Sequence, residues 1–225
     1  MSFIDELRDI QNKINKGSQA KIIFNEILNR CGLSSSSSEQ QYLRIYDMLS
    51  ANDDIHNDIR SAGLKQDVSV VGRITELICQ TGIEAGVPAG RYGELPKKWK
   101  WLGDFALFGS PFNVFISVKS YSARERLIAS GTGQLAAPII GYGLFDSPGE
   151  WNPNRVDQYR HRNFVAIYMP KSLYDILAAK TGRDHPVTEK RNFYGNPLLR
   201  KIEDLPVDLK RITSAPDNLV NLELL

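Results

Sequence analysis

Two residue types that build metal and disulfide sites are scarce in this sequence. Its 225 residues include two cysteines and three histidines. Neither Cys31 nor Cys79 has a second Cys or a His at the spacing of a metal site, and both lie among apolar neighbours. The sequence therefore predicts two buried, reduced thiols in a cytosolic protein, and it argues against a disulfide framework or a zinc site.

Long hydrophobic runs are also missing. No apolar stretch approaches the roughly 18 to 20 residues that a membrane helix needs. Near the N-terminus, Asp5 and Glu6 stand where an export signal would carry lysines. We therefore expect a soluble, cytoplasmic protein without a membrane partner. Hydrophobic residues at 42% and charged residues at 24% exclude disorder and collagen-like repeats, and they fit one domain or one domain with a small helical appendage.

Charge is nearly balanced in total, at +2, but it is unevenly distributed. Residues 1–62 carry seven basic and nine acidic side chains, a balance of minus two, whereas residues 91–126 carry seven basic and three acidic ones, a balance of plus four. Residues 155–211 are also basic. A phosphate-rich partner would meet the middle and the C-terminal third of the chain. The same charges also fit the solvated faces of unrelated elements.

Helical spacing of apolar residues dominates the first part of the chain. It predicts helices over residues 3–14, 22–28, 38–49 and Val68–Gln80, the first two joined near Lys16–Ser18. We therefore expect a helical N-terminal region over 1–62, serving as a cap or for dimerisation, and a separate core over 63–225, in which the candidate catalytic and DNA-binding residues described below lie.

From residue 101 the pattern becomes that of a sheet. Apolar segments at 101–108 and 112–119 flank a turn at Gly109–Pro111, which predicts two neighbouring strands. A capping box at Ser122–Glu125 predicts a helix after them. A further strand over Phe164–Met169 and a helix over Leu173–Ala179 follow. Strands alternating with helices predict an α/β layer arrangement.

Two charged residues interrupt the apolar strands. Asp104 is the acid inside the first strand, and Lys119 is the base at the end of the second. Burying either charge costs several kcal/mol unless it is paired or bound to an ion. One interpretation is a structural ion pair. The other is a phosphodiester hydrolase, in which the carboxylate holds Mg²⁺ against a phosphate oxygen and the lysine orients or deprotonates the attacking water.

The segment from Asp104 to Ser117-Val118-Lys119 resembles the PD-(D/E)XK nuclease superfamily. The resemblance is to its Ser-x-Lys variant, found in type II restriction endonucleases that cut sites with CCGG, CCNGG or CCWGG cores, and it covers roughly residues 68–134. It implies a restriction-endonuclease-like fold with a central mixed sheet flanked by helices. It also implies catalysis by Asp104 and Lys119 with Mg²⁺ as the cofactor.

The resemblance leaves the third active-site ligand open. The family variant carries a glutamate about a dozen residues after the lysine, but this sequence reads Gly131-Thr132-Gly133-Gln134 there. Gln134 is one candidate, as a neutral ligand of the metal or of water. Glu76 on the preceding helix is preferred, because a carboxylate is the stronger donor for Mg²⁺ and Glu76 has no competing local task. Glu125 is a weaker candidate.

A triplet just after the lysine suggests how DNA would be read. The family's CCNGG and CCWGG cutters carry an Arg-Glu-Arg-like triplet there, and this chain has Arg124, Glu125 and Arg126. Arginine can bind guanine O6 and N7 bidentately and glutamate can accept from cytosine N4, although the same cluster fits a solvated, capped helix start. Further DNA contacts are expected at Ser117, Lys97, Lys98, Lys100, Arg160, Arg162, Lys190 and Arg191.

These observations favour a Mg²⁺-dependent, site-specific endonuclease of double-stranded DNA, a prokaryotic type II restriction enzyme. A homodimer is expected, because two copies of one site most simply cut a palindrome. The alternatives are a DNA repair or recombination nuclease of the same fold and an inactive DNA-binding protein. A nucleotide cofactor is not expected, because the predicted turn Gly141–Gly143 lacks the lysine and glycine spacing of a phosphate-binding loop.

Overall fold

The computed structural model describes residues 16–50, 68–120, 137–180 and 186–225. The chain divides into two compact units, Met1–Ala85 and Gly86–Leu225. The boundary expected at residues 62 and 63 lies outside the described residues. The observed division lies between Ala85 and Gly86, because the helix that precedes it packs within the helical unit.

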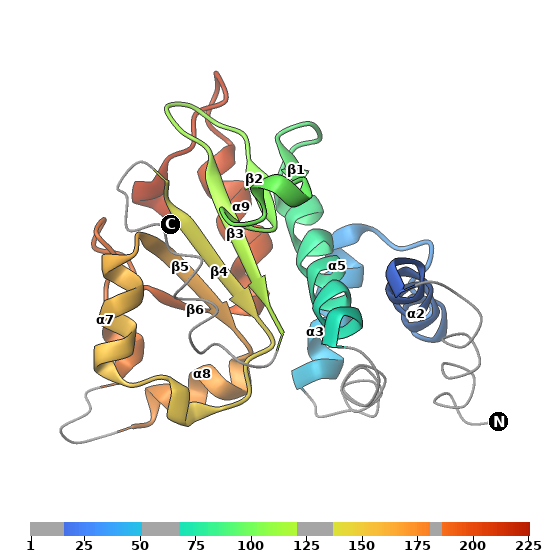
Figure 1. The fold of residues 1–225 in the computed structure, drawn as a ribbon, viewed down its shortest axis with the longest axis horizontal. Helices are drawn as coiled ribbons and strands as arrows, with labels where there is room; N and C mark the ends of the chain where they lie inside the picture. Colours follow the sequence, from blue (N-terminus) through green and yellow to red (C-terminus); the bar gives the residue numbers. More distant parts are fainter. Residues whose placement is uncertain (1–15, 51–67, 121–136, 181–185) are drawn as a thin grey trace. The chain divides into compact units, whose positions relative to one another are not determined.

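The first unit is helical. Its described helices are α2 (Lys16–Arg30), α3 (Ser38–Ser50) and α5 (Val68–Gly86), drawn in blue to blue-green in Figure 1. Gly82 allows α3 and α5 to pack closely, since a β-carbon there would lie 2.7 Å from the Tyr42 ring. The expected helix over 3–14 lies outside the described residues, and the expected joint at 16–18 is the first turn of α2. Both cysteines are free thiols, Cys79 buried as expected and Cys31 half-buried.

The second unit is built on a mixed sheet. Its described strands run in the order β1 (Tyr92–Glu94), β2 (Phe105–Leu107), β3 (Val114–Lys119), β4 (Ile139–Gly143), β5 (Phe164–Met169) and β6 (Leu199–Lys201). The first three are antiparallel, and β3 to β6 are parallel. The expected hairpin is confirmed as β2–β3, and the expected strand at Phe164–Met169 is confirmed as β5.

Helices cover both faces of this sheet (Figure 1). Helix α7 (Pro153–His161) connects β4 to β5, and α8 (Lys171–Ala178) connects β5 to β6. Right-handed crossovers between successive parallel strands place both helices on one face, where they share a core with Ile167 and Met169 of β5. The next residue position, Tyr168, points the other way and its hydroxyl donates to Asp208 of α9 (Leu205–Thr213) at 2.8 Å. The expected α/β class with a mixed central sheet is confirmed.

Strand β4 corrects one expectation. Gly141–Gly143 is not a turn but the end of a fully buried strand. Glycine disfavours strands, so the local pattern resembled a turn. At Gly143 a β-carbon would lie 2.5 Å from the Phe145 ring and 2.7 Å from the Lys119 carbonyl oxygen. Close packing against β3 therefore explains the glycine.

Among the described helices, none has the length and apolar character needed to cross a membrane.

Candidate active site

Asp104 is fixed by three hydrogen bonds at the start of β2. Its main-chain N–H donates to the Ile116 carbonyl at 2.7 Å, and its own carbonyl accepts from the Leu95 N–H at 2.9 Å. Its carboxylate oxygen Oδ2 accepts from the Val118 N–H at 2.7 Å. The side chain is only 12% exposed. Gly103 permits this approach, since a β-carbon there would lie 2.8 Å from the Ile116 carbonyl oxygen.

Lys119 reaches the same carboxylate from the end of β3. Its Nζ lies 3.9 Å from Asp104 Oδ2, and its side chain is 21% exposed. The hydrogen bonds of Nζ go instead to neutral acceptors, Ser117 Oγ and the Val118 carbonyl, each at 2.9 Å. The structure therefore brings Asp104 and Lys119 together on one face of the sheet. Ser117, expected to contact DNA, is 1% exposed and holds the lysine in place.

A second lysine completes the charge arrangement. Lys100 Nζ lies 3.6 Å from Asp104 Oδ1 and 3.5 Å from Glu94 Oε1. Lys100 was expected to bind phosphate, but here it bridges two carboxylates. The two lysines balance the two acids. Glu94 was not among the residues predicted from the sequence, because the loop between β1 and β2 brings it to this position and no local pattern marks it.

The distances fit both interpretations of the Asp104–Lys119 pair. Direct, charge-assisted hydrogen bonds are typically about 2.7–2.9 Å long, whereas both lysines form longer ion pairs, 3.6–3.9 Å from the carboxylate. Ion pairs of this length are compatible with a structural role and also with amines that bind a phosphate or a water beside the carboxylate.

The carboxylate oxygens of the candidate site are compatible with one mode of Mg²⁺ binding. This ion is commonly held by one or two carboxylates together with waters and substrate phosphates, and Asp104 supplies one carboxylate. In residues 16–50, 68–120, 137–180 and 186–225 no group of three His, Cys, Asp or Glu side chains is placed to hold a metal. The described residues thus fit an ion held by one carboxylate together with waters and substrate phosphates, and they do not fit an ion held by protein ligands alone.

The third-ligand candidates have different outcomes. Glu76 was preferred as a carboxylate without a competing local task, and the structure pairs its Oε2 with Arg73, one turn earlier on α5, at 2.6 Å. Glu76 belongs to the helical unit, and its role as a metal ligand stays a prediction. Gln134 and the triplet Arg124, Glu125 and Arg126 lie outside the described residues.

The other expected DNA contacts fall into two groups. Lys190 is paired with Asp157 at 2.9 Å, and the Arg160 guanidinium lies 5.1 Å from the centre of the Phe193 ring. Both therefore have structural partners. Lys97, Lys98, Arg162 and Arg191 have exposed side chains.

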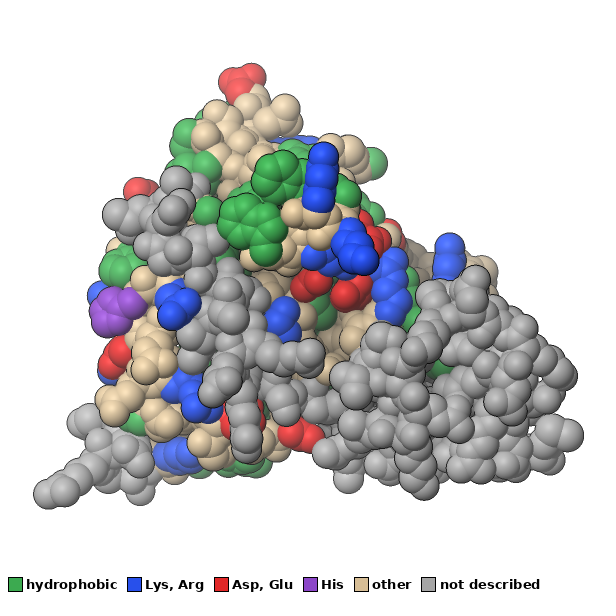
Figure 2. All heavy atoms as spheres, in the orientation of Figure 1, with side chains coloured by type: hydrophobic (Ala, Val, Ile, Leu, Met, Phe, Trp, Pro, Cys, Tyr) green, Lys and Arg blue, Asp and Glu red, His purple; other side chains and the backbone are tan. Residues whose placement is uncertain are grey.

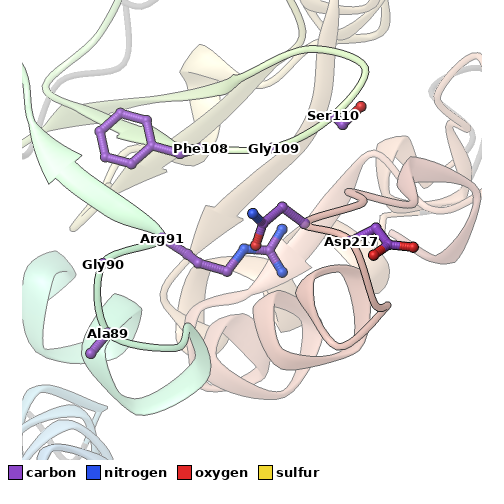
Figure 3. Close-up of a pocket in the computed structure, with 8 residues that line it drawn as sticks. Ala89, Gly90, Arg91, Phe108, Gly109, Ser110 and Asp217 are labelled. Carbon is purple, nitrogen blue, oxygen red and sulfur yellow. The ribbon is translucent and has the colours of Figure 1, made fainter.

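A cavity elsewhere in the second unit is lined in part by Arg91. It has a volume of about 580 Å³ and lies among Ala89–Arg91, Phe108–Ser110 and the C-terminal residues Asp217 and Asn218. Figure 3 shows the Arg91 side chain extending toward the C-terminal segment. Its Nη1 donates to the Thr213 carbonyl at 2.6 Å and its Nη2 to that of Leu219 at 3.3 Å. Arg91 thus holds the C-terminal segment, and the cavity is lined by neither Asp104 nor Lys119.

Comparison with known proteins supports the fold. No protein-family model matches the sequence, and no curated protein matches it either. A solved structure of the restriction endonuclease PspGI with its substrate DNA is similar, with a TM-score of 0.52 and 12% sequence identity, over 89% of this chain and 96% of that one. The chain therefore has a restriction-endonuclease-like fold. The Ser-x-Lys variant and its type of site stay predictions.

Proposed function

We propose that this protein is a Mg²⁺-dependent endonuclease that hydrolyses phosphodiester bonds of double-stranded DNA. The observation that carries the proposal is the position of Asp104 and Lys119. They come from adjacent strands, share one face, and lie 3.9 Å apart without a direct hydrogen bond. The restriction-endonuclease-like fold supports the same class, and the similar structure contains substrate DNA.

Four residues of the candidate site have roles in this proposal. Mg²⁺, when bound, would polarise a phosphate oxygen and offset charge on phosphorus. Asp104 would hold the ion, since its backbone and carboxylate are fixed by the hydrogen bonds of β2 and β3. Lys119 Nζ, positioned by Ser117 Oγ, would donate to a phosphate oxygen or orient the attacking water. Lys100 would limit repulsion between Asp104 and the phosphate.

The more specific part of the proposal is a type II restriction enzyme of the prokaryotic cytoplasm. It would act as a homodimer on a short palindrome containing G:C pairs, which Arg124, Glu125 and Arg126 would read. This part is supported by the resemblance of Asp104 and Ser117-Val118-Lys119 to that enzyme class.

Incubating the purified protein with genome-length DNA, with Mg²⁺ or with EDTA, tests the proposal on a gel. We expect discrete fragments with Mg²⁺ and intact DNA with EDTA. Cuts confined to branched or unpaired DNA would instead indicate a repair nuclease. A shifted band without any cleavage would overturn the catalytic role and leave a DNA-binding protein.

A further inference from the structure

An exposed aromatic surface lies next to the candidate active site. Trp99 is 44% exposed and Trp101 is 61% exposed, whereas the third tryptophan, Trp151, is 1% exposed. The two exposed rings lie 6.3 Å apart between centroids, with planes at 40°. Figure 2 shows hydrophobic side chains over the β1–β2 end of the sheet beside basic and acidic ones. Large apolar rings left in water on a small domain commonly mark a binding surface.

The loop that carries these rings is held in shape by its own backbone. It connects β1 to β2, and the Leu95 N–H donates to the Asp104 carbonyl at its base. A 3₁₀ helix, η1 (Lys97–Trp99), follows Pro96, and the Leu102 N–H donates to the Trp99 carbonyl at 2.9 Å. The rings are therefore presented by a preorganised segment, which lowers the entropy cost of binding through them. Because the loop closes at Asp104, the rings are tied to the candidate catalytic carboxylate.

Charge identifies the kind of partner. Lys97 and Lys98 are exposed, and Lys98 Nζ stands 5.8 Å from the centre of the Trp99 ring. Glu94 and Asp104 are already occupied by Lys100. Among the described residues, the face around the tryptophans therefore offers the positive charge of Lys97 and Lys98 together with ring surface, which complements a chain that carries both phosphates and flat bases.

Stacking also distinguishes paired from unpaired nucleic acid. In a duplex the faces of the bases are covered by their neighbours, so a protein ring on the surface reaches only edges and phosphates. An unpaired base exposes a face that can stack on an aromatic ring. Two tilted, exposed tryptophans beside lysines are suited to that second case.

We propose that the Lys97–Trp101 loop is a stacking platform for unpaired bases next to the candidate scissile phosphate. Trp99 and Trp101 bind base faces, and Lys97 and Lys98 bind the phosphates between them. This inference rests on the proposed nuclease function for its biological context, but binding by the platform requires no catalysis. The platform gives the protein a preference for DNA with a short unpaired stretch over fully paired DNA.

Binding in EDTA tests the platform without any cleavage. The probes are a labelled oligothymidylate, a duplex with three unpaired thymidines at its centre, and the same duplex fully paired. Replacing both rings, W99A/W101A, should weaken binding of the two unpaired probes by about tenfold or more. Binding of the paired duplex should change by less than about twofold, because phosphate contacts remain.

Two further variants make the result specific. W99F/W101F keeps stacking rings but removes the two exposed indoles and leaves only the buried Trp151. It should bind like the wild type while the fluorescence quenching by oligothymidylate disappears. Y194A removes a ring that is 42% exposed on a different loop, and it should bind every probe as the wild type does.

Three outcomes would overturn the inference. The first is unchanged binding of unpaired probes by W99A/W101A, and the second is an equal loss for paired and unpaired DNA. The third is a change in oligomeric state of W99A/W101A, measured by light scattering, with DNA binding intact, which would make the surface a contact between protein chains. Failure of the wild type to cut DNA in Mg²⁺ would overturn the nuclease proposal alone, since the binding assay contains no Mg²⁺.

Discussion

At the scale of single residues, the site depends on one amine placed by neutral partners. Lys119 Nζ is held by Ser117 Oγ and the Val118 carbonyl, close to Asp104 but not hydrogen-bonded to it. This geometry places the lysine beside an acid whose position the backbone fixes. It also means that function and stability can be separated by substitution.

We therefore expect Lys119→Ala to lower the cleavage rate by about 10²–10⁴-fold, the range for a positioned acid–base group, while DNA binding in EDTA stays close to wild type. Asp104→Asn should abolish the response to Mg²⁺ together with cleavage. Lys210→Ala changes an exposed lysine on α9 and serves as the control. Cleavage by Lys119→Ala at the wild-type rate would remove the lysine from the mechanism.

A second residue-scale prediction concerns Asp208, which is 7% exposed. Its carboxylate binds Arg200 at 2.7 Å and Arg211 at 2.6 Å. Asp208→Ala leaves the Arg200 charge, 11% exposed, without this partner, so we expect a loss of about 3 kcal/mol in the free energy of unfolding. Asp175→Ala breaks an exposed pair with Lys201 and should cost less than about 1 kcal/mol. Equal losses in urea melts would contradict this account.

At the scale of elements, the β3–β4 pair sets the position of the lysine. Lys119 and Gly143 are partners in the parallel ladder. A β-carbon at Gly143 would collide with the Phe145 ring and with the Lys119 carbonyl oxygen, so either the ring or the end of β3 must shift.

We expect Gly143→Ala to lower stability by about 1–3 kcal/mol, as overpacking does, and to lower the cleavage rate further than this loss of stability explains. Thermal melts and single-turnover cleavage measure the two effects. Gly149→Ala is the matched control, since a β-carbon there meets nothing within 4 Å. Wild-type behaviour of Gly143→Ala would show that β3 does not depend on this contact.

Helix α7 contributes a pH dependence. Tyr159 packs between Trp151 and Phe164, and burial raises its pKa from 10.0 to about 12. The folded protein therefore retains the phenol proton more tightly than the unfolded chain. The corresponding stability is complete below pH 10 and is lost as the pH rises toward 12.

Tyr159→Phe should remove this loss. Between pH 8 and pH 11 the wild type should lose more stability than the variant, by on the order of 1 kcal/mol, as measured by urea melts. A residual slope is expected from Tyr168, whose pKa burial also raises well above 10.0. Tyr194→Phe changes an exposed ring and should keep the wild-type slope. A steeper slope in Tyr159→Phe would contradict the assignment.

At the scale of the whole molecule, one candidate site per chain limits what a single copy can do. Cutting both strands of a palindrome is most simply achieved by two copies related by a two-fold axis. On the proposed restriction-enzyme function, we therefore predict that light scattering of the protein bound to a palindromic target gives a protein mass of twice 25.3 kDa. A complex with one chain per cleaved duplex would exclude the dimer and require successive nicking.

The sequence alone determined the hairpin and the pair of residues at its centre. The turn at Gly109–Pro111 and the alternation of Val114, Ile116 and Val118 are local signals, and they were enough to place Asp104 and Lys119 on neighbouring strands. The unbroken apolar run of Phe164–Met169 is also a local signal, and it correctly predicted the buried strand β5. Strand β4 was not predicted, because its glycines are there for close packing and disfavour strands in local patterns.

Only the tertiary structure decided which charges meet. Lys100 and Glu94 join Asp104 because the β1–β2 loop closes at Leu95 and Asp104, and loop closure leaves no periodic signal in the sequence. Helix α9 binds β5 through Asp208 and Tyr168, forty positions apart. Local patterns report which residues are buried, whereas the pairing of buried charges depends on distances that only the folded chain sets.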